Sequence, residues 1–193
     1  MRNILRRRVG ACALALMGFM YASGAEAQPM PNDNELQLTA GFFHAQDSDA
    51  GNANVDLSYG RFLANNHWEF GGRVGYQGIY NDNAPDVWNA SVVPFFDYHF
   101  YNVTEDDRVV PFVGGFVGMV FNDDDFDGTT GPELGAKFFM SRSTFATMRY
   151  RYEWFFDNYE VGDERAEGNH VFTVGLGYLW NCDDATENKR RSM

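Results

Sequence analysis

The sequence predicts an all-β fold, an eight-stranded antiparallel up-and-down β-barrel that spans a membrane. Three observations predict it. Apolar and polar residues alternate with period two in segment after segment. Aromatic residues make up 17% of the chain, whereas disordered chains are poor in them. The longest apolar stretch, from Val9 to Ala22, has 14 residues, which is too short for a membrane-spanning helix of about 20.

The N-terminal segment has the pattern of a cleaved signal peptide. Four arginines lie among the first eight residues, an apolar run follows from Ala11 to Tyr21, and Ala25-Glu26-Ala27 fits the small-x-small cleavage pattern. The alternative, a buried N-terminal helix, would find no helical partner downstream. We therefore expect residues 1–27 to be removed. They carry four Arg and one Glu, so the net charge of −12 would become −15.

The mature chain has the length of one domain, and its charge argues against a nucleic-acid partner, which needs a basic surface. Cys182 would be its only cysteine, so neither an internal disulfide nor a cysteine-based metal site is expected. We expect a barrel domain over 28–180 and a polar tail over 181–193.

Eight alternating segments follow in order: 35–44, 53–63, 68–80, 87–101, 110–121, 132–140, 144–156 and 169–180. In the third, Trp68, Phe70, Val74 and Tyr76 share one face, and Glu69, Arg73 and Gln77 share the other. The fifth is apolar on both faces and contains Gly114, Gly115 and Gly118, so its facing stays open and a bulge is expected there.

The last two segments alternate most clearly. In the seventh, one face carries Ala146, Met148, Tyr150, Tyr152, Trp154 and Phe156, and the other carries Thr147, Arg149, Arg151, Glu153 and Phe155. In the eighth, Phe172, Val174, Leu176, Tyr178 and Trp180 alternate with Thr173, Gly175 and Gly177.

An antiparallel sheet of eight strands leaves exposed edges unless it closes into a barrel. Period two allows two closed forms. A soluble calycin-type barrel in the periplasm would turn its apolar face inward around an apolar ligand, and a membrane barrel turns that face outward to lipid.

Three features favour the membrane form. The polar face carries charges of both signs, which suits a closed interior in which they neutralise one another. Its carboxylates, Asp56 among them, could pair with its lysine and arginines. The connections alternate between turns at 64–67, 102–109 and 141–143 and loops at 45–52, 81–86, 122–131 and 157–168, as in outer-membrane barrels. Aromatic residues also gather near segment ends, as in the girdles at membrane interfaces: Trp68, Tyr80, Trp88, Tyr98, Tyr101, Trp154, Phe156, Tyr178 and Trp180.

Eight strands enclose an interior that side chains can fill. The candidate lumen network consists of Glu69, Arg73, Asp97, Glu133, Lys137, Arg149, Arg151 and Glu153. These charged residues could line a path for ions through the barrel. We favour the alternative that they form a plug of salt bridges, in which bidentate Arg-carboxylate pairs make the interior rigid.

The segment from Gly131 to Phe139, the short turn after it, and the run from Ala146 to Tyr152 resemble a "G-x-x-G-x-K-(Y/F)-F … R-x-x-Y-R-Y" pattern. It is typical of small outer-membrane β-barrel proteins, of the outer-membrane protein X kind and the barrel domain of outer-membrane protein A. The last strand, from Thr173 to Trp180, resembles the terminal signal read by the barrel-assembly machinery, although here 13 residues follow Trp180. The resemblance covers about residues 34–180. We expect a monomer in the cell outer membrane.

Catalytic chemistry finds little support. His99 would point inward beside Asp97 and could act as an oriented base, but no serine lies at a convincing spacing. Lipid A deacylases place a His two residues before a Ser near the last strands, whereas His170 is followed by Val171 and Phe172. We expect no enzyme, no catalytic residues and no cofactor; a lipid A-modifying enzyme stays the less favoured alternative.

The third loop offers a candidate cation site. Asp123, Asp125, Asp127 and Gly128 match positions 1, 3, 5 and 6 of a calcium loop, but position 12 is Leu134 instead of Glu. The four loops together hold 13 acidic residues and one basic residue, Arg165. The simple interpretation is solubility, and the more specific one is a contact with outer-membrane lipid and lipopolysaccharide through divalent cations. The sequence thus predicts a non-enzymatic barrel with a structural or surface-interaction role.

Overall fold

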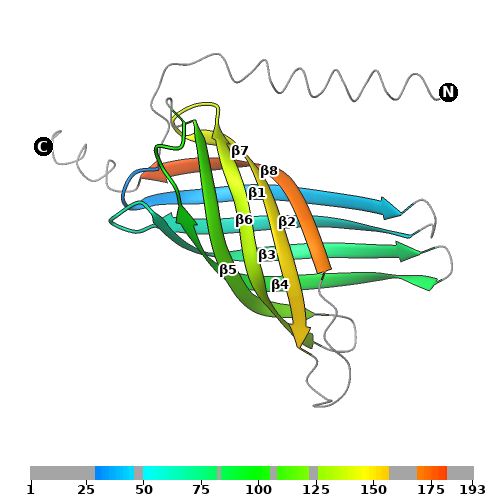
Figure 1. The fold of residues 1–193 in the computed structure, drawn as a ribbon. Helices are drawn as coiled ribbons and strands as arrows, with labels where there is room; N and C mark the ends of the chain where they lie inside the picture. Colours follow the sequence, from blue (N-terminus) through cyan, green and yellow to red (C-terminus); the bar gives the residue numbers. More distant parts are fainter. Residues whose placement is uncertain are drawn as a thin grey trace, which may run out of the picture.

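The computed structural model describes residues 29–45, 50–81, 84–104, 108–121, 126–156 and 169–181. They form a closed barrel in which each strand pairs antiparallel with its neighbours and β1 pairs with β8 (Figure 1). The strands are β1 Asp33–Ala45, β2 Ala50–Phe62, β3 Trp68–Asn81, β4 Ala84–His99, β5 Val109–Phe121, β6 Phe126–Phe139, β7 Thr144–Phe156 and β8 Asn169–Asn181. The predicted fold class is confirmed.

The strand bounds agree closely with the predicted segments, with one larger difference. β6 begins at Phe126, whereas the sequence places the start of this segment at 132. Pairing with β5 continues to the end of that strand, where Phe121 lies opposite Phe126, so the polar stretch before Pro132 is held in the sheet. The predicted signal peptide and the tail from Cys182 onward lie outside the described residues.

The bulge expected in β5 was predicted wrongly. Its register with β6 is continuous from Val109 to Phe121, and its inward and outward side chains alternate along the whole strand. An irregularity lies instead between β3 and β4, at Ile79 and Asn81. β5 is apolar on both faces because its inward Phe112 and Phe116 help to fill the barrel.

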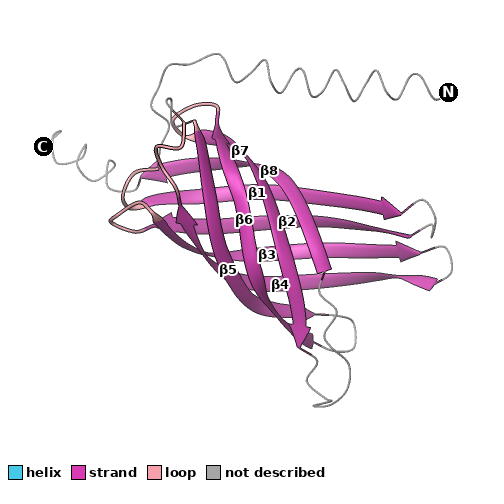
Figure 2. Cartoon of the chain, in the orientation of Figure 1, coloured by secondary structure: helices cyan, strands magenta, loops and turns pink. Residues whose placement is uncertain are grey.

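The turns that join β2 to β3, β4 to β5 and β6 to β7 gather at one end of the barrel, which we call the turn end (Figure 2). In the first of them the Leu63 N–H donates to Trp68 O over 2.8 Å and Asn66 has a φ of 49°, a left-handed conformation that asparagine tolerates. The opposite end, where the four predicted loops join the strands, is the loop end. Within the described residues no helix has the length and apolarity of a membrane span.

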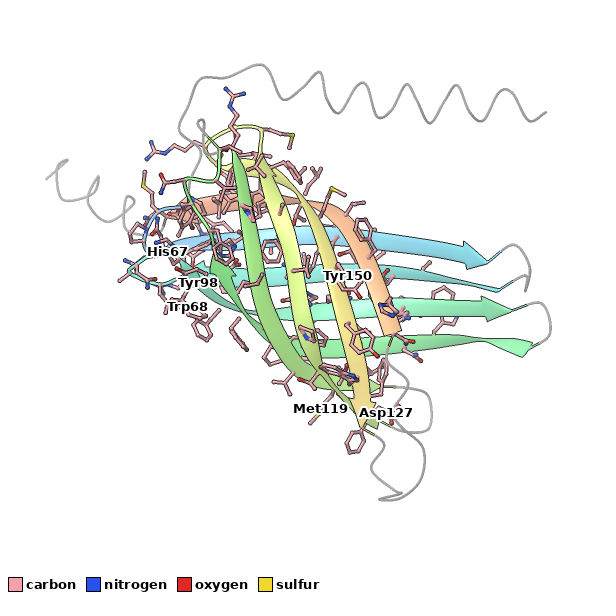
Figure 3. The ribbon with its side chains drawn as sticks, in the orientation of Figure 1. His67, Trp68, Tyr98, Met119, Asp127 and Tyr150 are labelled. Carbon is pink, nitrogen blue, oxygen red and sulfur yellow. The ribbon has the colours of Figure 1, made fainter. Side chains whose placement is uncertain are left out.

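Large apolar side chains cover the outside of the barrel. Valines, leucines and phenylalanines from the strands are about half exposed, as Val55, Val74 and Val174 illustrate. Aromatic side chains lie toward both ends. Trp68 packs edge-on against Tyr98 at the turn end (Figure 3). Tyr76 stacks on Trp88 at 5.2 Å toward the loop end. This distribution matches a lipid-facing apolar band between two aromatic girdles.

Glycines on the inner face lie directly opposite buried phenylalanines on neighbouring strands. The cross-strand pairs are Gly71 with Phe95, Phe112 with Gly135, and Phe145 with Gly177. In each pair a Cβ added to the glycine would meet the ring. The ring thus lies over the backbone of the glycine and covers the strand where it has no side chain. This contact helps to fix the register between the two strands.

This packing predicts that Gly177→Ala destabilises the barrel by about 1–3 kcal/mol, because the Phe145 ring is fully buried and has little room to shift. Gly72→Ala is the matched control, since Gly72 faces outward and a Cβ there meets nothing within 4 Å. Urea unfolding in phospholipid vesicles measures both. Equal stability of the two variants would contradict the packing.

Candidate functional site: the ion-paired lumen

An apolar plug closes the lumen at the turn end. Phe62, Val110, Phe139, Phe145 and Leu179 are buried and form one cluster, against which Tyr101 packs. The sequence places Tyr101 among the girdle aromatics, but its side chain is half-buried and its O–H donates to Asn66 O over 2.5 Å. Burial, together with nearby carboxylates, raises the pKa of the Tyr101 phenol, so it remains a neutral donor.

The first ionic layer lies next to this plug. Lys137 Nζ donates to Glu35 Oε2 over 2.5 Å and to Glu69 Oε2 over 2.8 Å, and its side chain is fully buried. His99 Nε2 lies 3.4 Å from the same Glu69 oxygen. The rings of Phe62 and Phe145 lie 5.0 and 5.2 Å from Nζ and give it cation–π contacts.

The second layer is built from two arginines and two carboxylates. The Arg73 guanidinium donates to both carboxylate oxygens of Glu133 over 3.3 and 3.0 Å. Arg149 lies 3.6 Å from Glu133 and 3.7 Å from Asp97. Glu133 therefore lies between two arginines, and all four side chains are buried.

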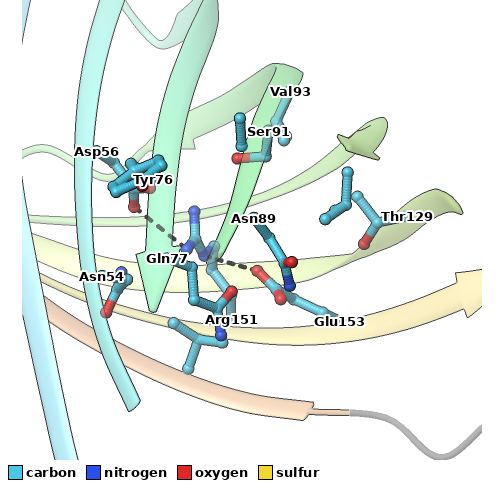
Figure 4. Close-up of a pocket in the computed structure, with 13 residues that line it drawn as sticks. Asn54, Asp56, Tyr76, Gln77, Asn89, Ser91, Val93, Thr129, Arg151 and Glu153 are labelled. Atoms are coloured by element: carbon cyan, nitrogen blue, oxygen red, sulfur yellow. Dashed lines mark ion pairs between the residues drawn. The ribbon is translucent and has the colours of Figure 1, made fainter. Parts of the chain in front are cut away.

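The third layer lies toward the loop end. Arg151 pairs with Asp56 at 3.2 Å and with Glu153 at 3.3 Å, and Figure 4 shows the guanidinium between the two carboxylates. These residues line a small cavity of about 30 Å³ together with polar side chains from other strands. The lumen thus changes from an apolar plug to layers of ion pairs and then to a polar cavity.

Most of these ion pairs cross the lumen. Lys137 on β6 reaches Glu35 on β1 and Glu69 on β3, and Arg151 on β7 reaches Asp56 on β2. These strands are not neighbours in the sheet. The pairs therefore tie opposite walls of the barrel together, which backbone hydrogen bonds between adjacent strands cannot do.

All eight members of the predicted lumen network face this interior, and each takes part in one of the ion pairs above. Glu35 is absent from the predicted set although it is almost completely buried and bonds Lys137. Asp56 was expected on the charged face, among the carboxylates available to the arginines, and it pairs with Arg151. Among the described ion-paired residues, Glu35 alone was missed. The signal was present in the first segment, where Glu35, Gln37 and Thr39 alternate with Leu36 and Leu38.

The predicted cation loop falls mostly outside the described residues, which include neither Asp123 nor Asp125. Asp127 lies in β6 opposite Val120, and the chain from Phe126 to Leu134 is part of this strand. Among the described side chains no group of three or more His, Cys, Asp or Glu residues is arranged to hold a metal. The loop site stays a prediction.

His99 has no access to a substrate. Its side chain is fully buried, and its ring lies 4.9 Å from Phe62 and 5.5 Å from Phe112. A general base must reach the proton that it abstracts. The surroundings of His99 are instead those of a packed lumen residue.

The orientation of the apolar and polar faces distinguishes a membrane barrel from a soluble calycin-type barrel. Lys137 is fully buried whereas Leu176 is 59% exposed. A calycin-type barrel would have the reverse arrangement, with an apolar interior and charges in water. The exposed apolar band and the ionic lumen are those of a membrane barrel.

This chain has the fold of a small outer-membrane β-barrel. The crystal structure of the outer membrane protein OprG from Pseudomonas aeruginosa matches it with a TM-score of 0.52 and 10% identity, over 81% of this chain and 99% of that one. Neisserial surface protein A (NspA) matches with a TM-score of 0.46 and 16% identity, over 76% and 92% of the respective chains. No protein-family model and no curated protein matches the sequence.

Proposed function

We propose that this protein is a non-enzymatic, monomeric barrel of the outer membrane, with a closed interior and a structural or surface-interaction role. The observation that carries the proposal is the filled lumen. The apolar plug at the turn end and the two ionic layers behind it bring buried side chains together from all eight strands. A cylinder filled in this way resists deformation and leaves no wide aqueous path.

The surface roles follow from the sequence and the outer face. Thirteen acidic residues in the four predicted loops provide oxygen ligands for divalent cations, which also bind the anionic groups of lipopolysaccharide. The last strand exposes Phe172, Val174, Leu176 and Tyr178 on one face, which supports recognition by the barrel-assembly machinery. We include lipopolysaccharide and this machinery among the proposed partners.

The filled lumen predicts that the purified barrel conducts no steady current in a planar lipid bilayer in 1 M KCl, because the plug is apolar and closely packed and the ion pairs block the path. An open porin of known conductance verifies the sensitivity of the recording. Folding is checked on the same sample by a shift in gel mobility on boiling. Regular stepwise openings from the folded protein would contradict the proposal.

A second measurement tests the surface role. Vesicles with lipopolysaccharide in the outer leaflet and Mg²⁺ in the buffer should protect the loop-end connections from proteolysis, and removal of Mg²⁺ by EDTA should abolish the protection. Vesicles of zwitterionic phospholipid are the control. Protection that is equal in both kinds of vesicle and insensitive to EDTA would argue against cation-bridged contact.

A further inference from the structure

His170 is a polar group on the outer face of the barrel near the loop end, where it is surrounded by aromatic rings. It is the second residue of β8, and its side chain is exposed. Its Nδ1 lies 2.6 Å from the hydroxyl oxygen of Tyr150 on β7, and its ring packs edge-on against Tyr152 at 4.9 Å. Trp154 continues this row of rings, 5.0 Å from Tyr152. Among the described side chains of the loop end, no other exposed group can carry a positive charge.

These four residues, which we call the His170 cluster, lie at the depth where lipid headgroups begin. Four residues separate His170 from Val174 near the middle of β8, which corresponds to about 13 Å along the strand. A strand tilt of about 40° reduces this to about 10 Å along the membrane normal. Half of an apolar band about 25 Å tall is about 12 Å. The imidazole therefore lies at the loop-side edge of the apolar band, within reach of headgroups.

The hydrogen bond to Tyr150 determines which donors the pair offers to a ligand. When a neutral imidazole accepts the phenol O–H at Nδ1, only its Nε2–H remains available. When the imidazole is charged, its Nδ1–H donates to the phenol oxygen, so Nε2–H and the phenol O–H are both available. The charged pair thus presents two donors and one positive charge. This combination suits the oxygens of a phosphate, which form charge-assisted hydrogen bonds.

The backbone of β8 is also open on one side at this point. The ladder between β1 and β8 ends at Val174, whereas β8 pairs with β7 as far as Asn169, and Figure 1 shows β1 and β8 diverging toward the loop end. Alternate residues of a strand direct their N–H and C=O to the same neighbour. The Phe172 carbonyl oxygen lies on the β1 side, 2.6 Å from the position that a Cβ on Gly41 would take. The His170 N–H therefore points toward β1 as well, where the ladder supplies no acceptor.

We propose that the His170 cluster binds a phosphate group of lipopolysaccharide through the imidazole Nε2–H, the phenol O–H of Tyr150 and the His170 backbone N–H. The inference rests on the proposed position of the loop end at the cell surface, and it adds a contact with this lipid that needs no divalent cation. The 13 acidic residues of the predicted loops repel soluble anions, whereas lipid phosphates are concentrated at the membrane surface. Trp154 and Phe172 are 40% and 56% exposed beside the cluster, where they can contact the sugars and acyl chains of the same lipid.

The test is native mass spectrometry of the folded barrel in detergent with added lipid A. EDTA is present throughout, because it removes the divalent cations on which the loop contact depends. We expect one lipid A molecule per barrel, bound about tenfold more weakly in His170→Gln, which removes a charge-assisted donor. Tyr150→Phe, which removes the phenol donor, should also weaken binding. Unchanged affinity in both variants would overturn the proposal.

His67→Gln is the matched control, because His67 lies in the β2–β3 turn at the opposite end of the barrel, where its ring stacks on Tyr98. We expect this variant to bind lipid A as the unmodified protein does. A loss as large as that of His170→Gln would overturn the assignment to the loop end. A shift in gel mobility on boiling verifies that each variant is folded.

Two further lipids test which headgroup the cluster recognises. We expect lipid A without its phosphates, and phosphatidylglycerol, to bind more weakly than lipid A itself. Equal binding of the dephosphorylated lipid would overturn recognition of phosphate, and equal binding of phosphatidylglycerol would overturn the assignment to lipopolysaccharide. All of these measurements are made without Mg²⁺, so they are independent of the cation-bridged contact that the proteolysis experiment tests.

Discussion

Replacing Lys137 by Met is expected to destabilise the barrel by about 3–5 kcal/mol, because it leaves Glu35 and Glu69 buried without their cation. The methionine side chain keeps most of the packing against Phe62 and Phe145. The loss therefore reports the unpaired charge more than a cavity. Urea unfolding in phospholipid vesicles, followed by tryptophan fluorescence, measures it.

Two further variants make this result interpretable. Arg142→Met removes an exposed cation of the β6–β7 turn, whose side chain contacts Met30, and is expected to change stability by less than about 0.5 kcal/mol. The triple variant Glu35→Gln, Glu69→Gln, Lys137→Met removes the whole charge group and should recover most of the loss, because no buried charge is left uncompensated. If Lys137→Met alone were as stable as the unmodified protein, the first ionic layer would not be paired as described.

Replacing Val174 by Arg is expected to cost about 2–4 kcal/mol, since Val174 lies on the outer face near the middle of β8 and a charge there meets the bilayer core. The same unfolding experiment measures the cost. Leu63→Arg is the depth control, because Leu63 is exposed just beyond the end of β2, where an arginine costs about 0–1 kcal/mol. Equal costs at the two positions would contradict the placement of the apolar band.

The alternation of polar and apolar residues was sufficient to predict much of the fold. In β3, β7 and β8 the polar and apolar residues separate cleanly, so the faces and the lumen residues could be read from the sequence. β5 could not be assigned in this way, because valines and phenylalanines occupy both of its faces. Its inward residues are fixed by their partners: Phe112 lies over Gly135 on the neighbouring strand.

The pairing inside the lumen could not be predicted from the sequence. Which carboxylate meets Lys137 depends on how the closed sheet tilts and brings β1 and β3 opposite β6. The start of β6 was also out of reach, because Asp127-Gly128-Thr129 has the composition of a loop and is held in the sheet only by its pairing with β5. Local composition predicts neither the ion pairs of Lys137 nor the start of β6.

Apolar side chains of this barrel face lipid, whereas ionic side chains fill its interior. Intermolecular NOEs between methyl groups and lipid acyl chains, measured on the protein with methyl labels in nanodiscs, test it without any substitution. We predict strong NOEs to acyl chains from Val55, Val174 and Leu176, and none from the inward Val93 and Val110. NOEs from Val110 to lipid, or their absence from Val174, would contradict this orientation of the two faces.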